Sequence, residues 1–533
     1  MSASTAGSAV RLPFKHALYA MLGIGLVNML IALDQTVVST ALPSIVSELK
    51  GFEYYAWIAN AYLLASVVSV PVFGRLGDYF GRKPFAVASV ILFTLASLLC
   101  GAAPDMRFLA LARALQGLGG GMMVGTAFAS IPDLFPDPRQ RVRWQVVMAA
   151  AYGIGTAAGP SLGGLLSQAF GWRSTFLVNL PVGLASLWCV ARYLPRYRHH
   201  AADGISIDIG GTVLIVAVLG SMQTLVERLP EHGIDSLALG LLAVVVLGSA
   251  ALLWCERRVS HPMIPLELFR HPDLVTLFIL ALLSGFIMFS LIFFVPLMLQ
   301  GGFGLTPRLA GLLATPLAAC IALGSLSNSS VLGRLKRPTD TLTFGFAALL
   351  YACFVLEATR AYTSHWVLLS AVSAAGVGLG FILNNLNIFG QEIAGPRHFG
   401  ITTALFQSLR MVGGMLGTTL IGTLIQVSYA SGALARARSL APQGLTPALE
   451  ARLSNPQLLI DPAMQHDTLQ ALRQAGLDGR PLLEACREVL VGALHTGIMT
   501  TGIAALIAAL LSLRLKHIRL RRAVRHSDTP PAH

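Results

Sequence analysis

Charged side chains are scarce in this chain of 533 residues. Asp, Glu, Lys and Arg together make up 12% of it, while hydrophobic residues make up 55%. A soluble globular domain carries roughly 25% charged residues, so the composition excludes that class of protein. Acidic residues are the rarer sign, with 25 Asp and Glu against 38 Lys and Arg, and the formal net charge is +13.

The sequence also has few cysteines and lacks a nucleotide-binding P-loop. The six cysteines show no spacing typical of a metal site or a disulfide framework. The sequence has no P-loop of the GxxxxGK[ST] type, which disfavours direct drive by ATP, and we find no nucleophile triad. We therefore expect no enzyme, no metal and no cofactor. Residues 1–16 lack a cleavable signal pattern, so the first apolar run is expected to remain as a helix.

Long apolar runs are what the chain has in abundance. Runs of roughly 20 residues, the length that crosses a bilayer as a helix, recur about fourteen times. They are 17–40, 55–73, 84–103, 107–130, 143–166, 174–194, 207–227, 236–255, 272–298, 308–330, 341–358, 365–389, 401–427 and 489–513. The predicted fold class is an all-α polytopic membrane protein.

The basic residues alternate between connectors. If the N-terminus is cytoplasmic, the cytoplasmic connectors and the basic tail 514–533 hold most of the Lys and Arg, and each short outside connector holds about one. This positive-inside pattern supports an even number of spans with both termini in the cytoplasm. Because the cations are spread over many loops that face anionic lipids, binding to nucleic acid is disfavoured.

The apolar runs divide the chain into parts. We expect a cytoplasmic N-terminus at 1–16, a six-helix bundle at 17–200, two inserted helices at 201–258 and a second six-helix bundle at 272–513. By parity the long connector 428–488 lies outside. A connection of about sixty residues predicts helical pieces of its own or a binding role, and a solvated amphipathic insertion is the alternative.

Several stretches resemble motifs of one family. Residues 74–83 (GRLGDYFGRK) resemble the signature loop between helices two and three of the major facilitator superfamily. Residues 33–43, 113–119 and 153–164 resemble motifs of the drug:proton antiporters in this superfamily. Residues 172–183 and 208–211 resemble motifs of the fourteen-helix branch, drug:proton antiporter family 2. The resemblance implies two six-helix bundles plus two extra central helices, proton antiport, the cell inner membrane, and a possible periplasmic adaptor at 428–488.

Two opposite charges are expected to meet inside the membrane. Asp34 lies nine positions before Pro43, and Arg113 lies nine positions after Pro104. At a rise of about 1.5 Å per residue both lie roughly 13 Å from the outer boundary. We expect them to pair and to take part in proton coupling, because a membrane-embedded charge needs a partner or a cavity. The alternative is a static ion pair that only orients helices.

Two motifs suggest moving parts. A carboxylate between glycines and basic residues in a cytoplasmic connector predicts a gate, and the alternative is a tight turn with ordinary positive-inside charge. The residues of this gate are Gly74, Asp78, Gly81, Arg82 and Lys83. The fifth apolar run combines a proline with glycines that let a helix bend and pack closely, and packing alone is the alternative role. These residues are Gly155, Gly159, Pro160, Gly163 and Gly164.

A weakly polar, aromatic substrate cavity is predicted between the bundles. The candidates are Asn28, Tyr62, Gln116, Gln145, Tyr152, Phe286, Met288, Phe381, Asn384 and Arg410. Each residue alone is more often a packing or lipid contact. We expect Arg410 to find partners among the amides of Asn384, Asn385 and Asn387, or to serve packing between helices.

The sequence thus predicts a proton-coupled multidrug efflux antiporter that works by alternating access. Its expected cargo is amphipathic or lipophilic compounds, cationic or neutral, and its expected partners are protons and membrane lipids. One alternative is a proton-coupled exporter of a single endogenous metabolite or siderophore. A non-transporting membrane receptor or scaffold is a second alternative, which Asp34 and the glycines of residues 155–164 argue against.

Overall fold

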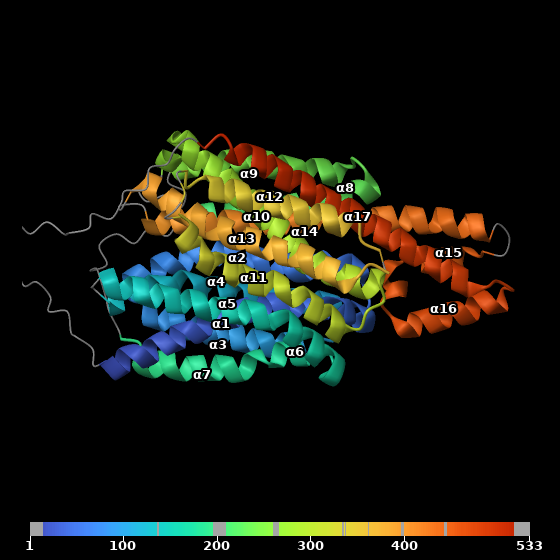
Figure 1. Ribbon diagram of the computed structural model, residues 1–533, viewed down its shortest axis with the longest axis horizontal. Helices are drawn as coiled ribbons and strands as arrows, with labels where there is room; N and C mark the ends of the chain where they lie inside the picture. The colour runs from blue at the N-terminus through green and yellow to red at the C-terminus, as the bar shows by residue number, and fades with distance from the viewer. Residues whose placement is uncertain are drawn as a thin grey trace, which may run out of the picture.

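The computed structural model describes residues 14–135, 138–195, 209–258, 266–332, 335, 337–360, 362–395, 399–441 and 445–515. The described chain is built from helices arranged side by side (Figure 1). The first helices are α1 (Phe14–Leu49), η1 (Phe52–Tyr54), α2 (Tyr55–Phe80), α3 (Arg82–Gly101), α4 (Met106–Leu134), α5 (Pro138–Phe170), α6 (Ser174–Leu177) and α7 (Asn179–Tyr193). Then follow α8 (Ile209–His232), α9 (Ser236–Arg258), η2 (Leu266–Arg270), α10 (Pro272–Leu297), η3 (Met298–Gly302), α11 (Pro307–Leu332), α12 (Asp340–Glu357), α13 (His365–Ala394), α14 (Phe399–Leu440), α15 (Pro447–Leu453), η5 (Pro456–Leu459), α16 (Pro462–Gln474) and α17 (Gly479–Ser512).

The predicted fold class is confirmed. Every apolar run named from the sequence overlaps a helix, and among the described residues 11 helices are long and apolar enough to cross a membrane. The run 174–194 is divided at Val178 into the short α6 and the longer α7. The beginning of α1 and the end of α17 lie at the same end of the bundle (Figure 1). The chain is a multi-pass membrane protein.

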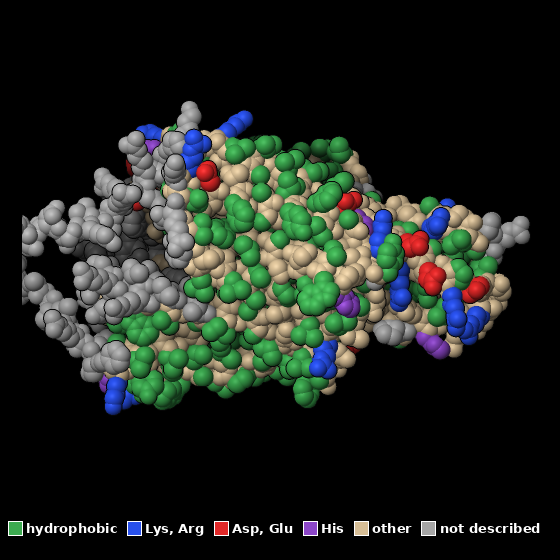
Figure 2. Space-filling model, in the orientation of Figure 1, with side chains coloured by type: hydrophobic (Ala, Val, Ile, Leu, Met, Phe, Trp, Pro, Cys, Tyr) green, Lys and Arg blue, Asp and Glu red, His purple; other side chains and the backbone are tan. Residues whose placement is uncertain are grey.

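Apolar side chains cover the body of the molecule (Figure 2). On α9, Leu239, Val246 and Leu247 are more than half exposed. Such a surface has no stable place in water, and it matches a helix that faces lipid. Charged side chains gather toward the two ends and on the part that projects at the right of Figure 2.

The membrane helices pack in two groups. Helices α1 to α7 contact one another, and helices α10 to α14 and α17 contact one another. The groups meet where α5 packs against α11 and where α2 packs against α14. The pair α8 and α9 lies outside both groups and reaches them through contacts of α8 with α2 and α14. We call the groups the N-half and the C-half.

The two halves are joined by hydrogen bonds at one end of the bundle. We call the end that bears α15 and α16 the distal end, and the end where α1 begins and α17 ends the terminal end (Figure 1). The Tyr55 hydroxyl, at the distal start of α2, donates to the Phe293 carbonyl at 2.9 Å. Gln300 Nε2 donates to the Thr40 carbonyl at 2.9 Å. These bonds hold the distal ends of the halves together.

A buried amide adds to this closure. Asn60 on α2 is fully buried and donates through Nδ2 to Thr419 Oγ1 on α14 at 2.7 Å. The hydroxyl of Thr418 donates in turn to Asn60 Oδ1. The amide of Asn60 therefore keeps these two hydrogen bonds only while the two halves are in contact, and a buried polar group that loses its partners is costly.

The part of the chain that projects from the distal end contains the end of α14, the segments α15, η5 and α16, and the start of α17, and we call it the distal projection. Its helix boundaries differ from those expected for the connector 428–488. Helix α14 continues to Leu440 and α17 already begins at Gly479, so both membrane helices extend beyond the bundle (Figure 1). The expected helical pieces are present between them as α15, η5 and α16. Tyr429 donates to the Leu453 carbonyl at 3.0 Å, and Gln457 Oε1 accepts from Gly51 N of the N-half at 3.0 Å. The projection thus contacts both halves.

Candidate functional site

A fully buried ion pair lies inside the N-half. Arg113 Nη1 on α4 lies 2.7 Å from Asp34 Oδ2 on α1, and the two side chains are 1% and 0% exposed. The two residues face each other at the same depth, as their distances from Pro43 and Pro104 predicted. Two charges removed from water at this depth are stable only when they are paired and hydrogen-bonded.

The Asp34 carboxylate accepts three hydrogen bonds. Besides Arg113, Gln116 Nε2 donates to Oδ1 at 2.7 Å and Asn179 Nδ2 donates to Oδ1 at 2.9 Å. Gln116 Nε2 also lies 2.9 Å from Ser97 Oγ on α3. A carboxylate has the acceptor capacity for all these donors, which come from α4 and α7. We call Asp34, Ser97, Arg113, Gln116 and Asn179 the Asp34 cluster.

The arginine of the cluster is held from several sides. Arg113 Nε donates to the Ile58 carbonyl at 3.2 Å, and Nη1 also donates to Gln116 Oε1 at 2.6 Å. The guanidinium carbon lies 4.5 Å from the centre of the Tyr62 ring on α2. A cation over an aromatic face gains further electrostatic stabilisation when it is desolvated. Tyr62 and Gln116, predicted as cavity residues, therefore contact the ion pair directly.

Glycines of α4 make room for Tyr62. A Cβ atom on Gly117 would lie 2.2 Å from the Tyr62 carbonyl oxygen, and one on Gly120 would lie 2.5 Å from the Tyr62 hydroxyl. Contacts this short do not occur between real atoms, so α2 approaches α4 this closely only because these positions lack a side chain. Ser66 Oγ completes the contact by donating to the Gly117 carbonyl at 2.9 Å.

Electrostatic interactions extend from Tyr62 toward the C-half. The Tyr62 hydroxyl interacts with Gln35 and lies within electrostatic range of Tyr152 on α5. Tyr152 is also within electrostatic range of Arg410 on α14. Tyr152 is therefore near both Tyr62 and the cation of the opposite half.

The expected amide partners of Arg410 are wrong. Arg410 donates to Gln407, one helical turn earlier on α14. Asn384 donates to the Ser325 carbonyl at 3.2 Å, and Asn385 exchanges hydrogen bonds with Asn328. The side chains of Asn384 and Asn385 on α13 therefore bond to α11. The Arg410 guanidinium bonds to Gln407 on its own helix.

The glycines of α5, a helix of the N-half, pack against helices of both halves. A Cβ on Gly155 would lie 2.5 Å from the Met29 carbonyl, and one on Gly159 would lie 1.8 Å from Thr36 Oγ1. Gly163 has the same relation to α1, whereas Gly164 faces the Pro307 carbonyl of α11 at 2.3 Å. Pro160 lies inside the helix between these contacts. The predicted close packing is therefore present, with α1 on one side and α11 on the other.

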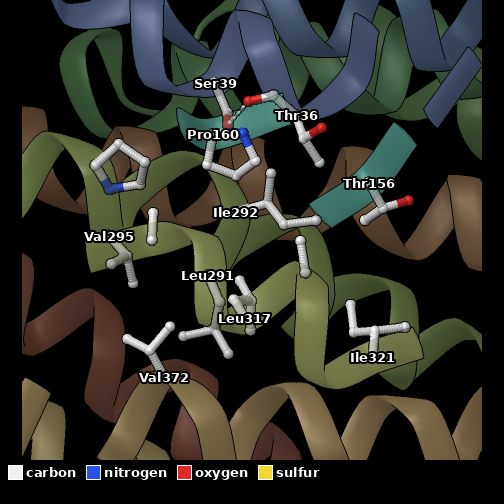
Figure 3. Close-up of a pocket in the computed structure, with 13 residues that line it drawn as sticks. Thr36, Ser39, Thr156, Pro160, Leu291, Ile292, Val295, Leu317, Ile321 and Val372 are labelled. Carbon is white, nitrogen blue, oxygen red and sulfur yellow. Dashed lines mark hydrogen bonds between the residues drawn. The ribbon is translucent and has the colours of Figure 1, made fainter. Parts of the chain in front are cut away.

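A small central cavity lies between the halves at this level (Figure 3). Its N-half wall has hydroxyl groups and its C-half wall is apolar. The lining is Thr36, Ser39, Thr156, Pro160, Leu291, Ile292, Val295, Pro296, Ala314, Leu317, Ala318, Ile321 and Val372. A volume of ≈ 20 Å³ holds about one water molecule, so the cavity is closed to a drug-sized ligand in this conformation.

The other cavity candidates lie in different surroundings. Asn28 is buried, and its Nδ2 has no partner among the described residues. Met288 is buried in the core, and Phe286 on the same helix is half-buried. Phe381 packs edge-to-face against Phe344, whose ring is 55% exposed on the outer surface of α12. The side chain of Gln145, also predicted to face the cavity, lies outside the described residues.

The predicted gate lies at the turn between α2 and α3. Gly81 has a φ of 89°, a conformation that favours glycine, and Arg82 begins α3 directly after it. Lys83 is half-buried, and the backbone of Gly74 approaches Gly125 on α4. The side chain of Asp78 lies outside the described residues, so its role in the gate stays a prediction.

Sequence reasoning did not assign Asn179 and Ser97 to the site. Asn179 lies within the stretch 172–183 that resembles a family motif, and Ser97 is a single hydroxyl in the apolar α3. Both side chains are fully buried beside Asp34. A polar residue in an apolar membrane helix was the available signal, since such residues normally seek a partner inside the bundle.

Comparisons with known proteins agree with this architecture. The sequence profile described as Major Facilitator Superfamily matches residues 24–418. The chain is 30% identical over 503 residues to the multidrug transporter protein MdtP of Bacillus subtilis (strain 168), covering 92% of this chain and 91% of that one. It is 32% identical over 415 residues to the tetracenomycin C resistance and export protein of Streptomyces glaucescens, covering 76% and 75%.

Solved structures share the fold at lower identity. The crystal structure of a bacterial homolog of the human lysosomal transporter Spinster, inward-facing and occupied, gives a TM-score of 0.64 with 17% identity over 94% of this chain and 98% of that one. An auto-inhibited peptide transporter of the POT family gives 0.61 with 14% identity, covering 95% and 98%. With a family profile that spans most of the membrane helices, the chain belongs to the Major Facilitator Superfamily, whose members are transporters.

Proposed function

We propose that this protein exports amphipathic drug-like compounds in exchange for protons, as an antiporter of the fourteen-helix drug:proton branch. The observation that carries the proposal is the Asp34 cluster, a carboxylate and an arginine buried together in the middle of the N-half. Membrane-embedded ionisable groups of this kind mark proton or substrate pathways. The relatives named for multidrug transport and for tetracenomycin C export support drug-like cargo.

The chemistry of the proposed coupling follows from the contacts of Asp34. Arg113, Gln116 and Asn179 all donate to its oxygens. These donors and the positive charge of Arg113 stabilise the ionised carboxylate, so a proton binds Asp34 more readily once Arg113 has withdrawn. A movement of α4 or α7 relative to α1 would therefore change whether Asp34 is ionised, so that proton binding tracks conformation.

The proposed conformational change is a rocking of the two halves around the central cavity. In this structure Tyr55 to Phe293 and Asn60 to Thr419 join the halves at the distal end. Alternating access requires these bonds to break when the distal end opens. In that movement α5 and α11 would slide along the contact between Gly164 and Pro307, and the turn around Gly81 would act as the terminal gate.

The proposed location is the inner membrane of the cell, with the terminal end in the cytoplasm. The positive-inside pattern and the shared position of the beginning of α1 and the end of α17 support this orientation. The distal projection would then extend outside the membrane, where it could contact a periplasmic adaptor. Deletion of residues 445–478, with α14 and α17 joined by a short linker, tests the adaptor proposal. Export across the whole envelope should fall while transport in vesicles remains, and unchanged export would remove the adaptor.

The main experiment uses purified protein in liposomes that contain a pH-sensitive dye. Lipophilic cations, neutral drugs and acidic drugs are added to wild type, Asp34→Asn and the control Asp467→Asn, whose carboxylate is exposed on α16. We expect several compounds to move protons through wild type and the control but not through Asp34→Asn. Undiminished drug-driven proton movement in folded Asp34→Asn would contradict the proposed role of Asp34.

The same experiment separates the other functions considered from the sequence. A response to a single compound class would favour an exporter of one endogenous metabolite or siderophore. No response from folded wild-type protein, with no accumulation of any compound in vesicles, would favour a receptor or scaffold. Transport of many compounds without proton movement would support the proposed drug export and contradict the proposed exchange for protons.

A further inference from the structure

The C-half contains a cation in the membrane region that has no ionic partner among the described residues. Arg410 lies on α14, at the level where Gly285 of α10 touches it. Its side chain is half-buried, and in the described part of the chain it forms no ion pair with a carboxylate. The other arginine of the central region, Arg113, is neutralised by Asp34. The two membrane-embedded arginines are therefore in opposite electrostatic situations.

An unpaired charge in the membrane is costly and is normally found where it faces a cavity or binds a ligand. Gln407 accepts one hydrogen bond from Arg410, and within the described part of the chain the other N–H groups of the guanidinium form none. The side chain is only partly exposed in this closed conformation, so a cargo would reach it when the halves separate.

The position of Arg410 is fixed by tight backbone packing. A Cβ on Gly285 would lie 1.9 Å from the Arg410 carbonyl oxygen, and one on Gly413 would lie 1.8 Å from the Leu282 carbonyl oxygen. Helices α10 and α14 are therefore in close backbone contact at Arg410 and again about one turn later, at Gly413. The guanidinium lies within electrostatic range of Tyr152 of the N-half, which places it near the interface between the halves.

We infer that Arg410 and Gln407 form a subsite that binds the carboxylate of an acidic amphipathic cargo. The guanidinium fork matches a carboxylate with paired, parallel hydrogen bonds, and this contact is stronger than one between neutral groups. The inference rests on the proposed export function and narrows its cargo. It differs from the cationic or neutral cargo expected from the sequence, because the carboxylate that would attract a cation is already occupied by Arg113.

The apolar part of such a cargo also has a place. The central cavity, which begins on α10 about 9 Å along the helix from Gly285, is walled on the C-half side by Leu291, Ile292 and Leu317 (Figure 3). When the halves separate, this wall would face the opening, and an apolar body could lie on it while the acid stays at Arg410. A pocket of apolar surface with few polar groups that fix orientation is typical of small-molecule sites.

Binding to purified protein in nanodiscs tests the subsite directly. The probes are ibuprofen and naproxen, each compared with its own methyl ester and primary amide, which differ from the acid mainly in charge. The proteins are wild type, Arg410→Gln, Arg410→Lys and the control Arg473→Gln, an exposed arginine on α16. Isothermal titration calorimetry gives each dissociation constant, with empty nanodiscs as the blank.

We expect wild type and Arg473→Gln to bind the acids more tightly than the esters and amides. Arg410→Gln should lose about tenfold to a hundredfold in affinity for the acids, as expected for a hydrogen bond to a charged group, and keep its affinity for the esters. Arg410→Lys should retain a preference for the acids. Retained ester binding shows that Arg410→Gln is folded.

Three results would overturn the inference: no binding of either acid to wild type, equal binding of acid and ester by wild type, or unchanged acid binding by Arg410→Gln. None of these results bears on proton coupling, which the liposome experiment with Asp34→Asn decides separately. A wild-type protein that transports neutral and cationic drugs but shows equal acid and ester binding would keep the proposed function and remove only the anion subsite.

Discussion

Asn179 and Asp34 are 145 residues apart in the chain, yet the Asn179 side-chain amide donates to the Asp34 carboxylate at 2.9 Å. Asn179 is the first residue of α7, directly after the break that separates α6 from α7. The bond therefore ties the beginning of one membrane helix to the middle of another. Since Asp34 is fully buried, each of its donors contributes to holding the carboxylate in place.

Replacing Asn179 by Ala should destabilise the N-half. We expect a loss of about 1–3 kcal/mol, because a buried charged group loses a hydrogen-bond donor. Thermal unfolding in detergent measures the loss, and the liposome assay should show reduced drug-driven proton movement. Asn387→Ala is the matched control, since that amide bonds only to the Leu383 carbonyl of its own helix. Equal effects of the two substitutions would argue against a special contribution of Asn179.

Replacing Asn60 by Ala should favour opening of the distal end. Asn60 is hydrogen-bonded to Thr419 and Thr418 across the two halves, and these bonds exist only in the closed arrangement. A loss of about 1.4 kcal/mol from one conformation changes its population ratio about tenfold. Distances between spin labels at Glu53 on η1 and Arg436 on α14 should shift to longer values. An unchanged distance distribution would show that other contacts alone keep this end closed.

Adding a methyl group at Gly159 should disrupt the contact between α5 and α1. A Cβ there would lie 1.8 Å from Thr36 Oγ1, so Gly159→Ala forces the helices apart and should cost about 1–3 kcal/mol. Transport should fall with it. Gly492→Ala is the control, because a Cβ at that position of α17 meets nothing within 4 Å. If Gly159→Ala keeps the stability and transport of wild type, the contact tolerates expansion.

The distal projection should loosen at low pH. Arg438 donates two hydrogen bonds to Glu450, at 2.7 Å and 2.9 Å, and these bonds lower the pKa of Glu450 below its ordinary value of 4.5. A depressed pKa means that the bonds stabilise the folded form above pH 4.5 and that this contribution is lost as the pH falls through the lowered value.

Hydrogen exchange of α15 measures this effect. Protection of its amides in wild type should decrease as the pH is lowered below about 4.5, after correction for intrinsic exchange rates. Glu450→Gln should show the lower protection already at neutral pH and little further change on acidification. A wild-type profile that is flat with pH would mean that the ion pair contributes nothing to the projection, as is common for exposed pairs.

Much of the site was predictable from residue types and depth. Asp34 and Arg113 could be paired because charges in apolar helices need partners and because a helix has a fixed rise per residue. The partners of Arg410 were predicted wrongly by the same reasoning. Amides at a suitable depth were available on α13, but they bond to Ser325 and Asn328 instead. Depth along an axis is readable from sequence, whereas the direction in which a side chain points around that axis depends on neighbouring helices.

The sequence by itself determined the membrane class, the approximate positions of the helices and the family motifs, because apolar length and the distribution of basic residues are local properties. The tertiary structure decided which residues meet. It brought Asn179 and Ser97 to Asp34, placed Tyr62 over Arg113 through the glycines of α4, and left Arg410 without a carboxylate in the described chain. Such contacts depend on packing between helices that are distant in sequence, and no local pattern encodes them.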